Sequence, residues 1–111
     1  MKPAAILMAL GLVACSGWTS DTFDVHIADG AATSATLKLC GEEIALQRRG
    51  ERFTGVRRTR CEGHGEIVVT FSDRRPVSCG IGYVTPGGEQ DFSYIVENGL
   101  CRGLHRSPDG V

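Results

Sequence analysis

Apolar and polar residues alternate along most of the chain after position 22, a pattern typical of strands that bury one face. Residues 23–27 (Phe-Asp-Val-His-Ile) alternate strictly, and residues 35–40 do so again. Residues 65–71 are β-branched and largely apolar, which makes them the strongest predicted strand. No segment carries a sustained 3.6-residue repeat. We therefore predict an all-β domain, a small antiparallel sandwich or barrel of about seven or eight short strands with two disulfides.

Turn signals divide these strands. Asp29-Gly30 and Asn98-Gly99 each mark a turn, and residues 100–105 form a last short strand. Residues 43–47 and 52–59 flank a turn at 49–51 and predict one hairpin. Residues 76–84 and 91–96 flank the Thr-Pro-Gly-Gly of 85–88 and predict a second. We interpret Tyr83, next to that turn, as a core side chain; the alternative is a presented binding loop.

The first fifteen residues have the parts of an export signal. Lys2 is followed by an uncharged apolar run over residues 4–13 and by the small residue Ala14. This run is too short to cross a bilayer, which takes about 20 apolar residues. Residues 12–15 then read Leu-Val-Ala-Cys, an aliphatic residue, a tolerant position, a small residue and a cysteine.

These four residues resemble the lipobox of bacterial lipoproteins. The resemblance implies cleavage just before Cys15 and acylation of that cysteine, with palmitate among the chains, and two or three chains anchor a protein stably. Ser16 follows, rather than the Asp that retains lipoproteins in the inner membrane. In a Gram-negative host the resemblance thus implies the periplasmic face of the outer membrane. The alternatives are a secretory signal cut near Ser16-Gly17 and a buried amino-terminal helix of a cytosolic protein.

The signal divides the chain into four parts. Residues 1–14 are the predicted signal peptide and residues 15–22 a lipidated tether. Residues 23–106 form a single disulfide-stapled β domain, which residues 107–111 extend as a flexible tail.

The chain has five cysteines, and assigning Cys15 to the lipid leaves an even set of four. Export to an oxidising compartment favours disulfides among them. Of the three pairings, local patterning favours Cys40–Cys61 and Cys79–Cys101, because each pair brackets a candidate hairpin. Each bridge is worth roughly 3 kcal/mol on the chain-entropy estimate.

Two further interpretations concern these cysteines. Residues 40–63 and 79–103 share the spacing of Cys, Gly-Glu, Phe and Cys, which indicates either a duplicated hairpin unit or coincidence in a glycine-rich chain. The steps Cys61-x2-His64 and Cys101-x3-His105 also offer zinc-type ligands. That metal-binding alternative needs reduced thiols, and the chain has no CxxC pair. We assign no metal and no cofactor.

Catalytic motifs are absent from the sequence. It contains no GxSxG, HExxH or GxxxxGK[ST]. His64 lies between Glu62 and Glu66, and an extended backbone would place all three side chains on one face. The flanking glycines favour a solvated turn instead. We therefore expect a protein that is not an enzyme and assign no catalytic residue.

The strongest charge feature is a run of six arginines within thirteen residues, opposed there only by Glu51. Its members are Arg48, Arg49, Arg52, Arg57, Arg58 and Arg60. Guanidinium forks suit carboxylates and phosphates. We expect either an anionic partner, such as lipid head groups, a glycan or an acidic protein patch, or a solvated hairpin balanced by nearby acidic residues. The net charge of −1 and the lack of interleaved aromatics argue against nucleic acid.

The sequence thus favours a non-enzymatic lipoprotein of the cell envelope, lipid-anchored, that serves as a binding or structural module. The first alternative is a periplasmic inhibitor of a hydrolase such as lysozyme, since some of those are similar in size, location and all-β form. The Ser-Gly and Tyr-Trp signature of the membrane-bound lysozyme inhibitors has no match here. The second alternative is the Cys/His metal-binding protein.

Overall fold

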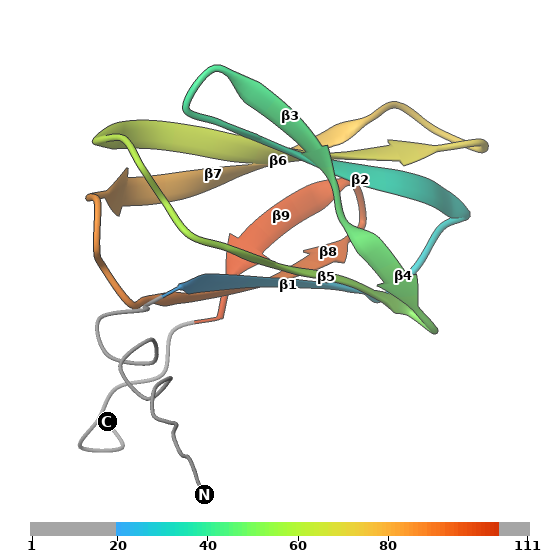
Figure 1. Ribbon diagram of the computed structural model, residues 1–111. Coiled ribbons are helices and arrows are strands. Elements are labelled where there is room, and N and C mark those ends of the chain that lie inside the picture. Colours follow the sequence, from blue (N-terminus) through green and yellow to red (C-terminus); the bar gives the residue numbers. More distant parts are fainter. Residues whose placement is uncertain (1–19, 105–111) are drawn as a thin grey trace, which may run out of the picture.

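Two β-sheets pack face to face in the computed structural model, which describes residues 20–104 (Figure 1). The five-stranded sheet has the order β4 (Gln47–Arg49), β5 (Arg52–Arg57), β1 (Asp21–Ile27), β8 (Asp91–Glu97), β9 (Leu100–Gly103). The four-stranded sheet has the order β3 (Glu42–Ala45), β2 (Ala32–Leu39), β6 (Gly63–Phe71), β7 (Val77–Val84). The all-β sandwich is confirmed. Within this described part, no helix is long and apolar enough to cross a membrane.

The alternating pattern explains the sandwich. Along β1, Phe23, Val25 and Ile27 are buried, while the intervening side chains lie on the outer face. Ile67 and Val69 of β6, in the four-stranded sheet, are also fully buried. Because each sheet has one apolar face, the two faces meet and form a single core.

The first predicted hairpin forms only in part. β4 and β5 pair around Gly50-Glu51, with Arg49 opposite Arg52. Residues 42–45, however, form β3, which pairs with β2 in the other sheet. The predicted strand over 43–47 therefore spans two elements, and buried Leu46 lies where the chain changes sheets.

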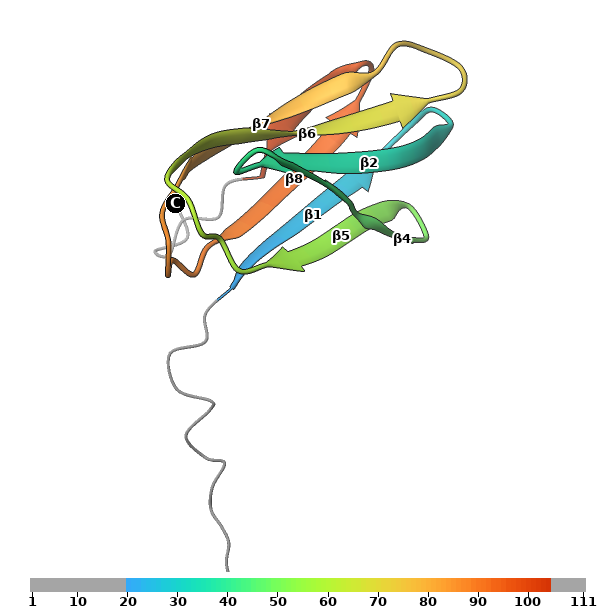
Figure 2. The ribbon, with the colours of Figure 1, turned by 45° about the horizontal axis from the view of Figure 1, so that its top comes forward.

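The second predicted hairpin is wrong. β7 and β8 lie in different sheets, and residues 85–90 carry the chain from one layer to the other (Figure 2). Both strands bury one face, and they do so by lying on opposite sides of the core rather than by pairing with each other. β8 pairs instead with β1, in parallel, and with β9. The parallel pair is an exception to the antiparallel arrangement that the sequence predicts.

Both predicted disulfides are present. Cys79–Cys101 joins β7 to β9 and thus links the two sheets; we call it the inter-sheet bridge. Cys40–Cys61 joins the turn after β2 to the loop before β6; we call it the loop bridge. Neither bridge closes the base of a hairpin. The repeated unit of one hairpin with its own disulfide, which the matched spacing suggested, is therefore not formed.

Candidate functional site

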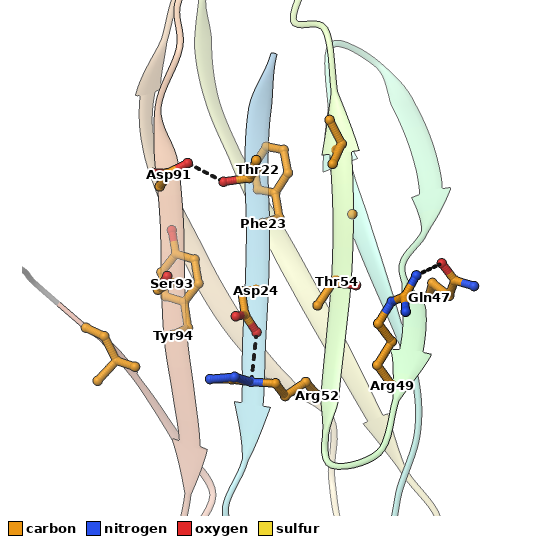
Figure 3. Close-up of a pocket in the computed structure, with 13 residues that line it drawn as sticks. Thr22, Phe23, Asp24, Gln47, Arg49, Arg52, Thr54, Asp91, Ser93 and Tyr94 are labelled. Carbon is orange, nitrogen blue, oxygen red and sulfur yellow. Dashed lines mark hydrogen bonds and ion pairs between the residues drawn. The ribbon is translucent and has the colours of Figure 1, made fainter.

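The outer face of the five-stranded sheet carries a hollow of about 1240 Å³, which we call the sheet hollow (Figure 3). Its floor comes from β1 and from the strands on either side of it. Asp24 of β1 lies directly between Thr54 of β5 and Ser93 of β8. These are the outward positions of strands whose inward positions form the core, so the same alternation that builds the sandwich places polar groups here.

Charged side chains of both signs line the sheet hollow. Arg49 and Arg52 lie on β4 and β5, and Asp24 and Asp91 lie on β1 and β8 (Figure 3). Arg52 Nε is 3.4 Å from Asp24 Oδ1. Arg49 donates to Gln47 over 3.4 Å, and Thr22 Oγ1 donates to Asp91 Oδ1. The Arg52–Asp24 pair therefore lies in the middle of the hollow, with Arg49 on one side and Asp91 on the other (Figure 3).

Asp24 is the least satisfied polar side chain on this face. Its Oδ1 atom is buried and accepts no hydrogen bond from the residues that the structure describes, although Arg52 lies nearby as an ion-pair partner. Leaving a buried acceptor without a hydrogen bond costs about 1–3 kcal/mol.

Two exposed apolar side chains also line the sheet hollow. Val56 of β5 is 69% exposed, and Leu104, just after β9, is 45% exposed. The two aromatic residues that line the hollow, Phe23 and Tyr94, have their rings buried in the core. The hollow therefore offers polar groups in its floor and apolar contacts at its sides, without an exposed aromatic ring.

The six predicted arginines do not form one surface. Arg48 is structural: its Nη1 donates to the carbonyl of Ala32 over 2.6 Å, and its guanidinium lies 5.2 Å above the ring of Phe53. Arg49 and Arg52 belong to the sheet hollow. The other three lie at the far end of β5, about 17 Å away at 3.4 Å per residue. Apart from Arg48, the arginines therefore form two separate groups, one at each end of β5.

This second group surrounds the loop bridge. Arg57, Arg58 and Arg60 line a cavity of about 240 Å³ together with Cys40 and Cys61, and we call it the bridge cavity. Arg57 Nη2 donates to Glu42 Oε1. The strand predicted over 52–59 is shorter in the structure: β5 ends at Arg57, and Arg58 and Arg60 lie in the loop that follows.

The solvated turn predicted around His64 is not formed, because β6 begins at Gly63 and includes His64. The alternative cluster of His64 with Glu62 and Glu66 does not form either. A register shift between Gly63 and Gly65 interrupts the alternation of β6. His64 meets the ring of Tyr83 edge-on at 5.5 Å between centroids, while Glu66 accepts a 2.5 Å hydrogen bond from Ser78. No histidine–carboxylate pair forms at these positions.

Tyr83 is not the core side chain that we predicted. It is 51% exposed, and its hydroxyl donates to Glu62 Oε1 over 2.9 Å. This hydrogen bond, together with partial desolvation, raises the pKa of Tyr83 above its usual value. Val84, the next residue, takes the buried position instead.

Candidate metal ligands do not gather in the described part of the chain. Between residues 20 and 104, no three or more His, Cys, Asp and Glu side chains gather in a way that could hold a metal ion. Cys61 and Cys101, the thiolates of the alternative metal site, are both in disulfides. Cys15, His105, the predicted signal peptide and the predicted tail lie outside the described residues.

Sequence reasoning missed the sheet hollow. Its signal was the row of polar residues at the outward positions of residues 22–26 and 91–93. That row becomes a site only because β1 and β8, about seventy positions apart in the chain, pair in parallel. Comparisons with models of protein families, with curated proteins and with solved structures found no match for this chain.

Proposed function

We propose that this protein is a non-enzymatic lipoprotein of the bacterial cell envelope that binds a protein partner through the sheet hollow. The lipobox-like Leu-Val-Ala-Cys of residues 12–15 supports the anchor on Cys15. The two disulfides support export, because such bridges persist in oxidising compartments and are rare in the cytosol. On this proposal the lipid holds the sandwich at a membrane surface.

The placement of Arg49 and Asp91 on opposite sides of the sheet hollow is the observation that carries the binding role. This division of charge defines the partner. A protein segment with a basic side chain meets Asp91, and an acidic side chain of the same segment meets Arg49. Val56 and Leu104 contact its apolar side chains. Such charge complementarity sets the orientation of the partner and excludes partners of a single sign.

The anchor is tested by Cys15→Ser in the native host. Wild-type protein should incorporate labelled palmitate and partition into detergent, and the variant should lose the label and appear in the soluble fraction. The intact mass of the mature wild type should exceed that of the polypeptide by the acyl groups. Membrane retention of Cys15→Ser at unchanged mass would overturn the anchor.

The binding role is tested by affinity capture from solubilised envelopes, with quantified proteins and three variants of the mature chain. Arg49→Glu and Asp91→Lys each reverse one side of the sheet hollow. Lys38→Glu makes the same charge change as Arg49→Glu, but on the outer face of the other sheet. We expect one protein whose recovery falls about tenfold with either hollow variant and is unchanged with Lys38→Glu. Equal recovery with all four proteins would refute the site.

A further inference from the structure

The loop bridge is more accessible than the inter-sheet bridge. Cys40 and Cys61 are both half-buried and line the bridge cavity. Cys79 of the inter-sheet bridge is only 1% exposed and belongs to the hydrophobic core, whereas its partner Cys101 is half-buried. An attacking thiolate must reach a sulfur along the axis of the S–S bond, so both cysteines of the loop bridge but only Cys101 of the inter-sheet bridge are open to attack. Attack on Cys101 would also leave the thiolate of Cys79 in the apolar core, where a thiolate is disfavoured.

The bridge cavity is also electropositive. Three arginines line it against one carboxylate, that of Glu42, which is a formal charge of +2. Positive charge beside a cysteine stabilises its thiolate and lowers the pKa of the thiol. It therefore favours exchange twice, by attracting the incoming thiolate and by making the cysteine that departs a better leaving group.

The backbone at Cys40 adds a consequence for the fold. Cys40 and Gly41 form the two-residue turn between β2 and β3, with φ values of +56° and +73°. Both positions are left-handed, as a type I′ hairpin turn requires, and only glycine adopts that conformation without cost. The disulfide adds a covalent restraint to this turn, and opening it would remove that restraint from the β2–β3 turn and from the loop that carries Arg58 and Arg60.

We propose that the loop bridge is a thiol–disulfide exchange site for a dithiol protein whose reactive end is anionic. A thiolate of the dithiol attacks Sγ of Cys61, the S–S bond breaks, and Cys40 leaves as a thiolate. The second thiolate of the dithiol then attacks the mixed disulfide and releases Cys61. Two electrons pass to Cys40 and Cys61, the dithiol becomes a disulfide, and its two protons end on the released thiolates.

This proposal is independent of the lipid anchor and of the sheet hollow. It is tested on the mature oxidised chain with two small thiols, anionic mercaptoethanesulfonate and cationic cysteamine, at matched thiolate concentrations. Free thiols are alkylated at intervals and assigned by peptide mass. The loop bridge should open first, and at least about threefold faster with the anionic thiol. About 1 M salt should remove that preference, because it screens the arginines.

Variants assign the effect to the arginines. Arg58→Ser with Arg60→Ser should slow opening of the loop bridge by the anionic thiol about threefold and abolish the preference for it. Arg75→Ser, in the exposed turn between β6 and β7, removes an arginine elsewhere and should change neither. The inter-sheet bridge in the same molecule reports whether a variant has simply loosened the fold. Earlier opening of the inter-sheet bridge, or equal rates with both thiols, would overturn the proposal.

Discussion

The two disulfides close loops of nearly equal length, but they join different parts of the fold. Their sequence separations are 21 and 22 residues, and their Cα–Cα distances are 5.6 and 5.3 Å. The chain-entropy effect on the unfolded state is therefore almost equal for both. Any difference in their contributions to stability must come from the folded state that surrounds each bridge.

The inter-sheet bridge joins elements that no backbone hydrogen bonds connect. β7 and β9 belong to different sheets, so packing and this covalent link hold them together. The loop bridge, in contrast, lies at one end of β2 and β6, which already pair along their length. Its loss leaves that pairing in place. The comparison shows that the position of a bridge decides its structural role when loop length does not.

Removing each bridge is the strongest test of this comparison. Cys79→Ala with Cys101→Ala should lower the free energy of unfolding by about 4 kcal/mol, about 3 from the lost cross-link and about 1 from the emptied core position of Cys79. Cys40→Ala with Cys61→Ala should cost about 2–3 kcal/mol, because its neighbours can relax into solvent. Denaturant unfolding followed by circular dichroism measures both.

The free energies of unfolding of the wild type and the two double variants are compared on the same two-state analysis. If the loop-bridge variant proved less stable than the inter-sheet variant, the distinction drawn between the bridges would be wrong.

Two glycines beside the bridges provide a second comparison, with smaller expected changes in stability. A Cβ at Gly65 would lie 2.5 Å from the carbonyl oxygen of Lys38 and 2.8 Å from Cδ1 of Leu39, just before Cys40. A Cβ at Gly80, next to Cys79, would meet nothing within 4 Å. We expect Gly65→Ala to destabilise the protein by about 1–3 kcal/mol and Gly80→Ala to change stability by less than about 0.5 kcal/mol.

Melting temperatures of the two glycine variants provide the measurement. The carbonyl oxygen of Lys38 cannot move away from residue 65 without disturbing the pairing of Lys38 with Glu66. Equal effects of the two substitutions would therefore contradict the packing described beside the loop bridge.

The smallest expected effect concerns the end of the β2–β6 pair opposite the loop bridge. There a side-chain hydrogen bond, rather than a disulfide, links the segments that flank the two strands. Asp73 Oδ1 accepts a hydrogen bond from the backbone N–H of Ala31 over 3.1 Å. This bond, and then the charge of Arg74, lower the pKa of Asp73 below its usual 3.8. A lowered pKa stabilises the fold above that value, and the contribution is lost as the pH falls below it.

Asp73→Asn should therefore melt slightly below the wild type at about pH 7, and the difference should vanish near pH 2. Thermal unfolding across this range checks the sign. A difference that grew on acidification would exclude the carboxylate as the fastening group.

The sequence predicted local structure well because alternation is a local property. Which residues are extended and which side faces the core follow from the period of two, and β1, β6 and the β4–β5 hairpin turn agree with that reading. It also predicted the correct cysteine pairs, although for the wrong reason, since neither pair closes a hairpin. Tyr83 was misplaced because a glycine-rich strand end has no clear alternation to assign its face.

By itself, the sequence determined the all-β class, the apolar face of most strands and, through an even set of four cysteines, two local disulfides. Only the tertiary structure decided which strands share a sheet, because one-faced strands can bury themselves either by pairing or by facing each other across the core. That choice sent β7 and β8 to different sheets, while the length of β5 separated Arg49 and Arg52 from the three arginines at the loop bridge. The same choice also brought Asp24 beside Ser93, and so created the sheet hollow.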